Sequence, residues 1–205
     1  MPNGTSDIVY FARMNFLGHF YLSGNAPGLI IGNYIADFVK GKSYLQYPDA
    51  VMKGILMHRE IDSFTDHHPQ VLLSKKRLFE KHRHYSLVIV DLFYDHFLAR
   101  NWQRYSPTAL ENYAQAIYSM IESHWEILPD PSRYMFPYMK NNNWLLRYAD
   151  IDGIARSLRG LAQRTRHPSR MAEAVDDLLT WDDEFEKEFI SFFADISDRF
   201  QVNPY

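Results

Sequence analysis

Polar residues that could bind a metal or transfer protons recur four positions apart in three strongly apolar stretches of the sequence. The pairs are Asn33 with Asp37, His58 with Asp62, and Asp91 with Asp95, the last followed directly by His96. Residues at positions i and i+4 lie one above the other on a helix face, so each pair can direct two side chains toward one point. Carboxylates and imidazoles are costly to bury in an apolar bundle unless they are paired or bind a metal. The spacing therefore predicts a buried metal or acid-base site built from several helices.

His58 and Asp62 give the strongest signal, because metal sites in helical proteins repeatedly use two ligands at this spacing. The alternative is a His-Asp side-chain pair on a solvated helix face, which is common by chance. Asp91 and Asp95 lie in the apolar run 88–98, where an unpaired carboxylate would raise its pKa or disrupt packing. We therefore expect both carboxylates to belong to the site.

Asp37 and His19 enter the prediction on weaker signals. Asp37 lies near the expected C-terminal end of a helix, where its charge opposes the helix dipole, and this cost favours a functional role. His19 lies in an apolar opening segment and is either a buried core histidine or a further ligand. Mixed oxygen and imidazole ligands suit Mn²⁺, Fe²⁺ or Zn²⁺, and also Mg²⁺ if water fills most of its octahedron. Such an ion stabilises charge on a phosphoryl oxygen and lowers the pKa of bound water, so we predict metal-assisted hydrolysis of a phosphoester.

Size and composition predict a soluble, cytoplasmic protein of one domain. The 205 residues are 46% hydrophobic, and the net charge of -3 (22 basic minus 25 acidic residues) gives no overall case for nucleic acid or a membrane surface. The absence of cysteine excludes disulfides and thiolate chemistry and permits a reducing compartment. No apolar run reaches the length of about 18 residues that a spanning helix needs, and the first 13 residues lack the pattern of a signal peptide.

The hydrophobic pattern predicts an all-α fold, a compact single-domain helical bundle over residues 14–205 with an N-terminal extension over residues 1–13. No stretch of useful length alternates with the period of a strand. Helices are expected at about 27–39, 48–66, 69–82, 86–103, 107–128, 144–149, 152–163 and 171–200. The helix expected over 86–103 is apolar on most faces, which is typical of a central helix.

Four segments resemble the acyl carrier protein phosphodiesterase family, also called acyl carrier protein hydrolase. They are MNFLGH at 14–19, GNYIADFVKG at 32–41, HREIDSFTD at 58–66 and DLFYDHFL at 91–98, and the resemblance continues through most of the chain. It implies a helical fold distantly related to the His-Asp metal-dependent phosphohydrolases. It also implies a phosphodiesterase, with Mn²⁺ as the favoured ion, that removes 4'-phosphopantetheine from holo acyl carrier protein to leave the apo form. The chain has no adjacent His-Asp in that order, and Asp95-His96 has the reverse order, so we place the ligands by the spacing found here.

We expect one or two divalent ions to be held by Asp37, His58, Asp62, Asp91 and Asp95, with His19 and His96 as further ligands or supporting groups. Three of the polar residues are also predicted to be catalytic. Asp37 would act at the metal, and Arg59 would steady the phosphate because a guanidinium matches two of its oxygens. His96 would protonate the leaving serine oxygen, a task that suits the pKa of histidine. The alternative for Arg59 is an ordinary surface position.

The partner that the resemblance implies is holo acyl carrier protein, with no nucleic acid, no membrane and the oligomeric state left open. Carrier proteins of this type are small and acidic, so the docking surface is expected to be locally basic, although a basic run is often only a solvated helix face. The basic clusters are Lys75, Lys76, Arg77, Lys81 and Arg83; Arg100 and Arg104; and Arg156, Arg159, Arg164, Arg166 and Arg170.

Two rival functions stay open from the sequence. The first is a metal-dependent phosphohydrolase acting on a nucleotide or another small phosphoester, which needs a pocket that recognises a base and no basic docking surface. The second is a helical binding protein whose histidines and carboxylates hold a structural metal or none.

Overall fold

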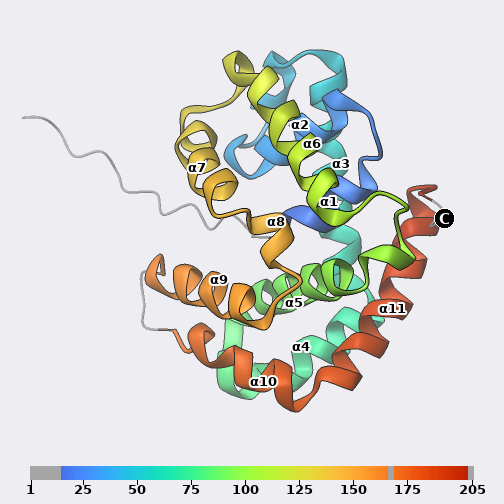
Figure 1. The fold of residues 1–205 in the computed structure, drawn as a ribbon, viewed down its shortest axis with the longest axis vertical. Helices are drawn as coiled ribbons and strands as arrows, with labels where there is room; N and C mark the ends of the chain where they lie inside the picture. Colours follow the sequence, from blue (N-terminus) through green and yellow to red (C-terminus); the bar gives the residue numbers. More distant parts are fainter. Residues whose placement is uncertain (1–14, 166–168, 203–205) are drawn as a thin grey trace, which may run out of the picture.

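Every regular element of the described chain is a helix (Figure 1). The computed structural model describes residues 15–165 and 169–202, and no strand occurs among them. The α-helices are α1 (Phe16–Leu22), α2 (Pro27–Ile35), α3 (Asp49–His67), α4 (Pro69–His82), α5 (Ser86–Arg100), α6 (Leu110–Ser123), α7 (Asp130–Asn141), α8 (Trp144–Arg147), α9 (Ile151–Gln163), α10 (Ala174–Thr180) and α11 (Asp182–Arg199). This confirms the predicted all-helical fold, whereas the extension predicted over residues 1–13 lies outside the described residues.

Helix α5 is the most buried helix of the lower half in Figure 1, where α4, α9, α10 and α11 surround it. Twelve of its fifteen residues are buried, as its apolar faces predict for a central helix. Helices α2, α6 and α7 lie in the upper half of the same view, α3 runs from the upper half downward, and α1 and α8 lie between the halves. None of the described helices is long and apolar enough to cross a membrane.

Helices α2 and α3 pack with their backbones in close contact because glycines lie on both facing surfaces. A Cβ atom added at Gly32 of α2 would lie 2.2 Å from the carbonyl oxygen of Val51, and one added at Gly54 of α3 would lie 2.5 Å from that of Leu29. Any side chain at these positions would force the two helices apart. The contact sets the residues that follow Gly32 alongside the turns of α3 that follow Gly54.

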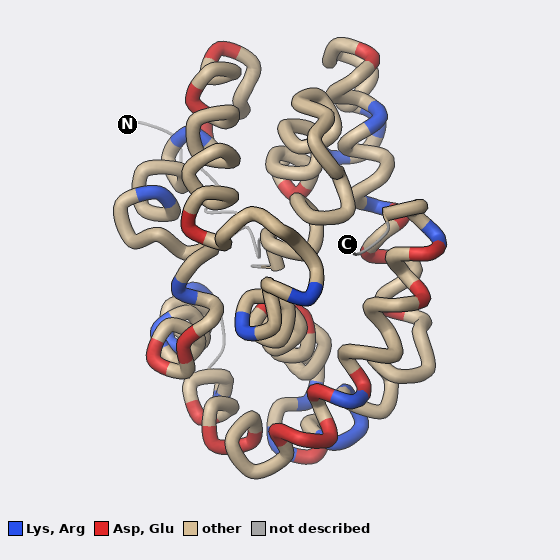
Figure 2. The backbone as a smooth tube through the Cα atoms, turned by 45° about the vertical axis from the view of Figure 1, so that its right-hand side comes forward, with Lys and Arg blue, Asp and Glu red and all other residues tan. Residues whose placement is uncertain are grey.

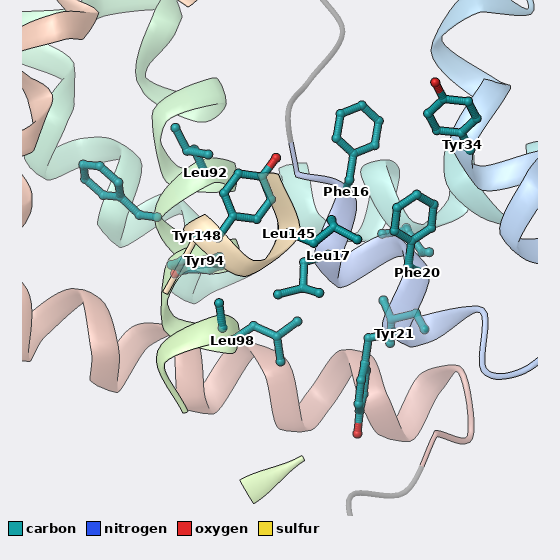
Figure 3. Close-up of a cluster of buried hydrophobic side chains, with 14 of the residues drawn as sticks. Phe16, Leu17, Phe20, Tyr21, Tyr34, Leu92, Tyr94, Leu98, Leu145 and Tyr148 are labelled. Atoms are coloured by element: carbon teal, nitrogen blue, oxygen red, sulfur yellow. The ribbon is translucent and has the colours of Figure 1, made fainter. Parts of the chain in front are cut away.

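The start of helix α1 is held by a carboxylate from α5. Asp95 accepts hydrogen bonds from the backbone amides of Leu17 (2.9 Å) and Gly18 (2.8 Å), two of the amides that have no partner within the helix itself. The apolar side chains of α1 also pack into the core. Figure 3 shows Phe16, Leu17 and Phe20 lying between side chains of α5 and Tyr34 of α2. Helix α1 is therefore fixed in both position and direction relative to α5.

The predicted single helix over 171–200 is wrong, because the chain bends at Trp181. Helix α10 ends at Thr180 and α11 begins at Asp182, while Trp181 has φ -120° and ψ 31°, outside the helical region. The segment opens with a 3₁₀ turn over Met171–Glu173. Charged and apolar residues keep a helical period across the bend, so the hydrophobic pattern alone did not reveal it.

Helix α7 lies between the helices predicted over 107–128 and 144–149, in a proline-containing stretch where no helix is predicted. Pro129 is the residue before the helix and Pro131 lies in its first turn, where the missing amide hydrogen has no cost. Pro137 lies inside the helix. Other predicted helices are shorter than expected: the helix predicted over 27–39 stops at Ile35 and continues as a 3₁₀ turn over Ala36–Phe38, and the helix predicted over 107–128 covers only 110–123.

Replacing Gly32 with alanine is expected to lower the free energy of unfolding by about 1–3 kcal/mol, because the added methyl overlaps the Val51 carbonyl. Gly160→Ala is the matched control, since a Cβ there meets nothing within 4 Å. In the interior of α9 it should instead raise stability by about 0.5–1 kcal/mol. Urea unfolding followed by circular dichroism measures both. Equal effects of the two substitutions would contradict the role given to the close contact of α2 and α3.

Candidate metal centre

Two histidines and an aspartate from two helices converge in the interior. One ligand atom each from His19 of α1 and from His58 and Asp62 of α3 lie within 4.8 Å of one another. His19 Nε2 is 3.4 Å from Asp62 Oδ1, and His58 Nε2 is 3.4 Å from Asp62 Oδ2. The two imidazole rings stack with their centroids 4.2 Å apart. Both histidine side chains are almost fully buried, at 3% and 7% exposure.

Asp37 joins this cluster from the 3₁₀ turn that follows α2. Its Oδ1 atom lies 3.4 Å from His58 Nε2, and 17% of its side chain is exposed. The turn matters for this placement, because it follows directly on the helix that Gly32 presses against α3. The carboxylates of Asp37 and Asp62, 17% and 24% exposed, therefore form the more open edge of the centre, and the two histidines form its interior.

Asn33 and Ser23 fix the orientation of His19. Asn33 Oδ1 lies 3.0 Å from His19 Nδ1, Asn33 Nδ2 donates to Ser23 Oγ (2.7 Å), and Ser23 Oγ donates to the carbonyl oxygen of His19 (2.8 Å). Because the amide nitrogen of Asn33 is occupied by Ser23, its oxygen accepts the Nδ1 hydrogen of His19. The lone pair of neutral His19 is then on Nε2, facing Asp62, which is the arrangement that a metal ligand needs.

Several polar atoms of the centre lack hydrogen bonds within the described part of the chain. They are buried and comprise His19 Nε2, both ring nitrogens of His58 and Asp37 Oδ2. Buried polar atoms without partners are rare and usually mark a water, an ion or a functional site. Metal-ligand distances of about 2.0–2.2 Å place neighbouring ligand atoms about 3.0–3.4 Å apart, so the observed 3.4 Å separations suit a shared cation. The residues present therefore fit a divalent metal ion.

The charges of the centre shift the pKa values of its members in opposite directions. Burial lowers the pKa of His19, and the nearby His58 lowers it further. Burial also lowers the pKa of His58, but the carboxylates of Asp37 and Asp62 more than compensate and raise it to about 9. Burial raises the pKa of Asp62, yet the two histidines together hold it well below its ordinary value. Without a metal, His58 is thus the protonated member at neutral pH and Asp62 is ionised.

Asp91 and Asp95 are not brought into this group of ligand atoms. Both border a small cavity beside His19, but the Asp95 carboxylate is used by the amides at the start of α1. Burial raises the pKa of Asp95 to about 8, although the two amide hydrogen bonds oppose the shift. Asp95 thus acts by positioning the helix that carries His19. As metal ligands, Asp91 and Asp95 stay predictions.

His96 and Arg59 also have structural partners in place of the expected catalytic ones. His96 is buried with Nδ1 2.7 Å from the carbonyl oxygen of Tyr148, and no described contact joins it to the centre. Arg59 donates to the carbonyl oxygen of Val39 (2.9 Å), and its guanidinium lies 5.2 Å from the ring centre of Tyr44. Arg59 therefore holds the loop after Asp37 against α3, and the structure gives neither residue a contact that supports its predicted role.

Comparison with known proteins places these residues in a family. The family model described as acyl carrier protein phosphodiesterase matches residues 14–196. The chain belongs to this family. All four side chains of the centre lie inside the matched range, and residues 1–13 lie outside it.

Relatives in the acyl carrier protein phosphodiesterase family cover nearly the same length. A protein of that name from Photorhabdus laumondii is 34% identical over 181 residues, which is 88% of this chain and 91% of the relative. Proteins of the same name from Serratia proteamaculans and an Enterobacter species are 34% and 36% identical, each over 88% of this chain and 94% of the relative. No solved structure matches the chain.

The affinity of the centre for a divalent metal is expected to rise with pH. His58 has a pKa of about 9 and must lose its proton before its nitrogen can bind a metal. The apparent association constant should therefore increase by about tenfold per pH unit between about pH 6.5 and 8.5 and level off above the pKa. Calorimetric titration with Mn²⁺ in buffers of different ionisation enthalpy measures the affinity and counts the released protons.

The matched control for this titration is His67→Gln, which changes an exposed histidine at the end of the same helix. It should leave both the affinity and the proton count unchanged, whereas His58→Gln should remove the pH dependence. An affinity that stays constant over the whole pH range would show that His58 is not a protonated ligand.

Proposed function

We propose that the chain is a metal-dependent phosphodiesterase that hydrolyses holo acyl carrier protein to apo acyl carrier protein and 4'-phosphopantetheine, in the cytoplasm. Family membership and the names of the relatives support the activity. The observation that carries the metal dependence is the convergence of His19, His58 and Asp62, with buried imidazole nitrogens that have no hydrogen-bond partner among the described residues.

The proposed cofactor is Mn²⁺, held by His19, His58 and Asp62 with Asp37 beside them. Two imidazole nitrogens with carboxylate oxygens form a ligand set that suits Mn²⁺, Fe²⁺ or Zn²⁺ better than Mg²⁺, which prefers oxygen and water. When bound, the ion would stabilise negative charge on the phosphoryl oxygens and lower the pKa of water.

The side chains of the centre have two further roles, which are to orient a ligand and to accept a proton. Asn33 and Ser23 keep His19 in one tautomer and orientation, so its Nε2 needs no rearrangement to act as a ligand. Asp37 is one of the two partly exposed carboxylates of the centre, and its Oδ2 atom has no hydrogen-bond partner among the described residues. In this proposal Asp37 accepts a proton from the attacking water. His96 is left out, because its Nδ1 atom bonds the carbonyl oxygen of Tyr148 and no described contact joins it to the centre.

The carrier protein must approach the centre directly, because the bond that is cut joins the phosphate to a serine of the carrier itself. The loop from Val39 to Tyr47, which Arg59 ties to α3, follows Asp37 in the chain and exposes Lys42 and Leu45. A basic and apolar edge of this kind fits an acidic partner. We therefore place the docking surface around this loop.

The basic clusters expected from the sequence are less available than their charges suggest. Several of their members bridge to acidic residues of the chain itself: Arg77 to Glu188, Lys81 to Asp177, Arg100 to Asp182 and Glu186, and Arg170 to Glu173. Figure 2 shows the same mixture over the outer helices, where acidic and basic residues are interspersed. A surface ion pair leaves little net field for a partner, so these clusters are weaker docking candidates.

The direct test is incubation of metal-stripped protein with holo acyl carrier protein, with and without Mn²⁺, followed by intact-mass analysis of the carrier. The proposal predicts loss of the phosphopantetheine mass only when metal is present. His58→Gln and Asp62→Asn should lower the rate by at least about 100-fold. Loss of a residue that only hydrogen-bonds to a metal ligand already lowers activity by about 10–100-fold, and loss of the ligand itself should cost at least as much. His67→Gln, on the exposed end of α3, should retain the rate.

Each negative result has a definite meaning. An unchanged carrier mass with every divalent ion would reject this substrate, and turnover of a small phosphoester by the same centre would then favour the rival phosphohydrolase. Cleavage that persists in both centre variants would reject the assignment of the site but keep the activity.

A further inference from the structure

A second polar pocket lies between α8 and α9, in elements that do not contribute to the metal centre. It encloses about 580 Å³ of empty space, part of it open to solvent. Its lining includes Trp144, Arg147, Arg156, Ser157, Gly160 and Arg164. Three arginines around one pocket stand out in a chain whose net charge is -3.

The described residues give the arginines of this pocket no acidic partner. Among the described residues, no carboxylate forms an ion pair with Arg147, Arg156 or Arg164, and the backbone carbonyl of Asp152 accepts the Nε hydrogen of Arg156 at 3.2 Å. Arg77 and Arg100, in contrast, bridge to acidic side chains. Like charges gathered in one pocket repel one another unless an anion lies between them. All three arginines are exposed, so water screens this repulsion and their guanidinium groups stay accessible to an anion.

The face of α9 that lines the pocket is left open in its middle. Ser157, Gly160 and Arg164 follow one another at helical spacing, so they share one side of the helix. A Cβ at Gly160 would meet nothing within 4 Å, so no neighbouring atom requires glycine there. Glycine in a helix interior costs about 1 kcal/mol relative to alanine. Its effect here is to keep space between Arg156 and Arg164 on the helix surface.

We propose that this pocket binds the phosphate groups of a small phosphorylated ligand that carries at least two phosphates, such as a nucleoside diphosphate. Guanidinium groups match phosphate oxygens in pairs, and three of them suit a ligand with more than one phosphate. Half-buried Trp144 offers a ring face on which the planar base of a nucleotide can stack. The site is independent of the proposed phosphodiesterase activity, because it shares no residue with the centre of His19, His58 and Asp62.

The test is calorimetric titration of the metal-free, full-length protein with ADP, with inorganic pyrophosphate and with adenosine. The pocket should bind ADP with one-to-one stoichiometry and should not bind adenosine. The double substitution of Arg147→Gln and Arg164→Gln should weaken binding by about tenfold or more, since each removes charge-assisted hydrogen bonds. Arg104→Gln, an exposed arginine outside the pocket, is the matched control and should bind as the wild type does.

A second variant blocks the space without removing charge. Gly160→Leu fills the open middle of the α9 face, and because a Cβ is free of contacts there, the protein should fold with unchanged or higher thermal stability. This variant should lose ADP binding while it keeps phosphodiesterase activity.

Comparison of the three ligands separates the contribution of the phosphates to the affinity from that of the base. Equal affinity for ADP and pyrophosphate would support the phosphate site and give the base no part, and tighter binding of ADP would support stacking on Trp144 as well. Failure of both to bind, or binding that the pocket variants leave unchanged, would overturn the proposal. So would charge-dependent binding of acidic carrier protein alone, which would make the arginines a protein-docking surface.

Discussion

The close contact of α2 with α3 is the constraint on which the metal centre depends. Gly32 and Gly54 leave no room for a side chain between the two backbones, so the register of one helix against the other is tightly restricted. That register sets Asp37, in the turn that follows α2, beside His58 of α3. Helix α1 then brings His19 to the same point, because its first amides are held by a carboxylate from α5.

The centre itself works against the stability that this packing provides. It buries two imidazoles and places carboxylates at their side, and several of their atoms have no hydrogen bond in the described part of the structure. Such groups cost free energy unless an ion or water satisfies them. The pKa of His58 rises and that of Asp62 falls, which is how the protein compensates part of this cost when no cation is bound. A bound cation would replace that internal pairing and stabilise the folded state further.

The sequence predicted the centre where the relevant information was local, as in the spacing of His58 and Asp62. The same signal did not decide the role of Asp91 and Asp95, because spacing within one helix does not show which neighbouring element a face meets. Asp95 faces the amides of α1, a contact 77 residues away in sequence that only tertiary packing determines. The missed parts of the fold have similar reasons: the bend at Trp181 keeps a helical hydrophobic period, and the prolines around α7 lie mostly where a helix tolerates them.

Anomalous X-ray scattering from crystals grown with Mn²⁺ tests the central claim most directly, because it locates the ion without assuming a substrate. The account predicts one main peak within about 2.3 Å of His19 Nε2, of a ring nitrogen of His58 and of a carboxylate oxygen of Asp62. A main peak at the carboxylates of Asp91 and Asp95, or no peak at either place at saturating Mn²⁺, would contradict it.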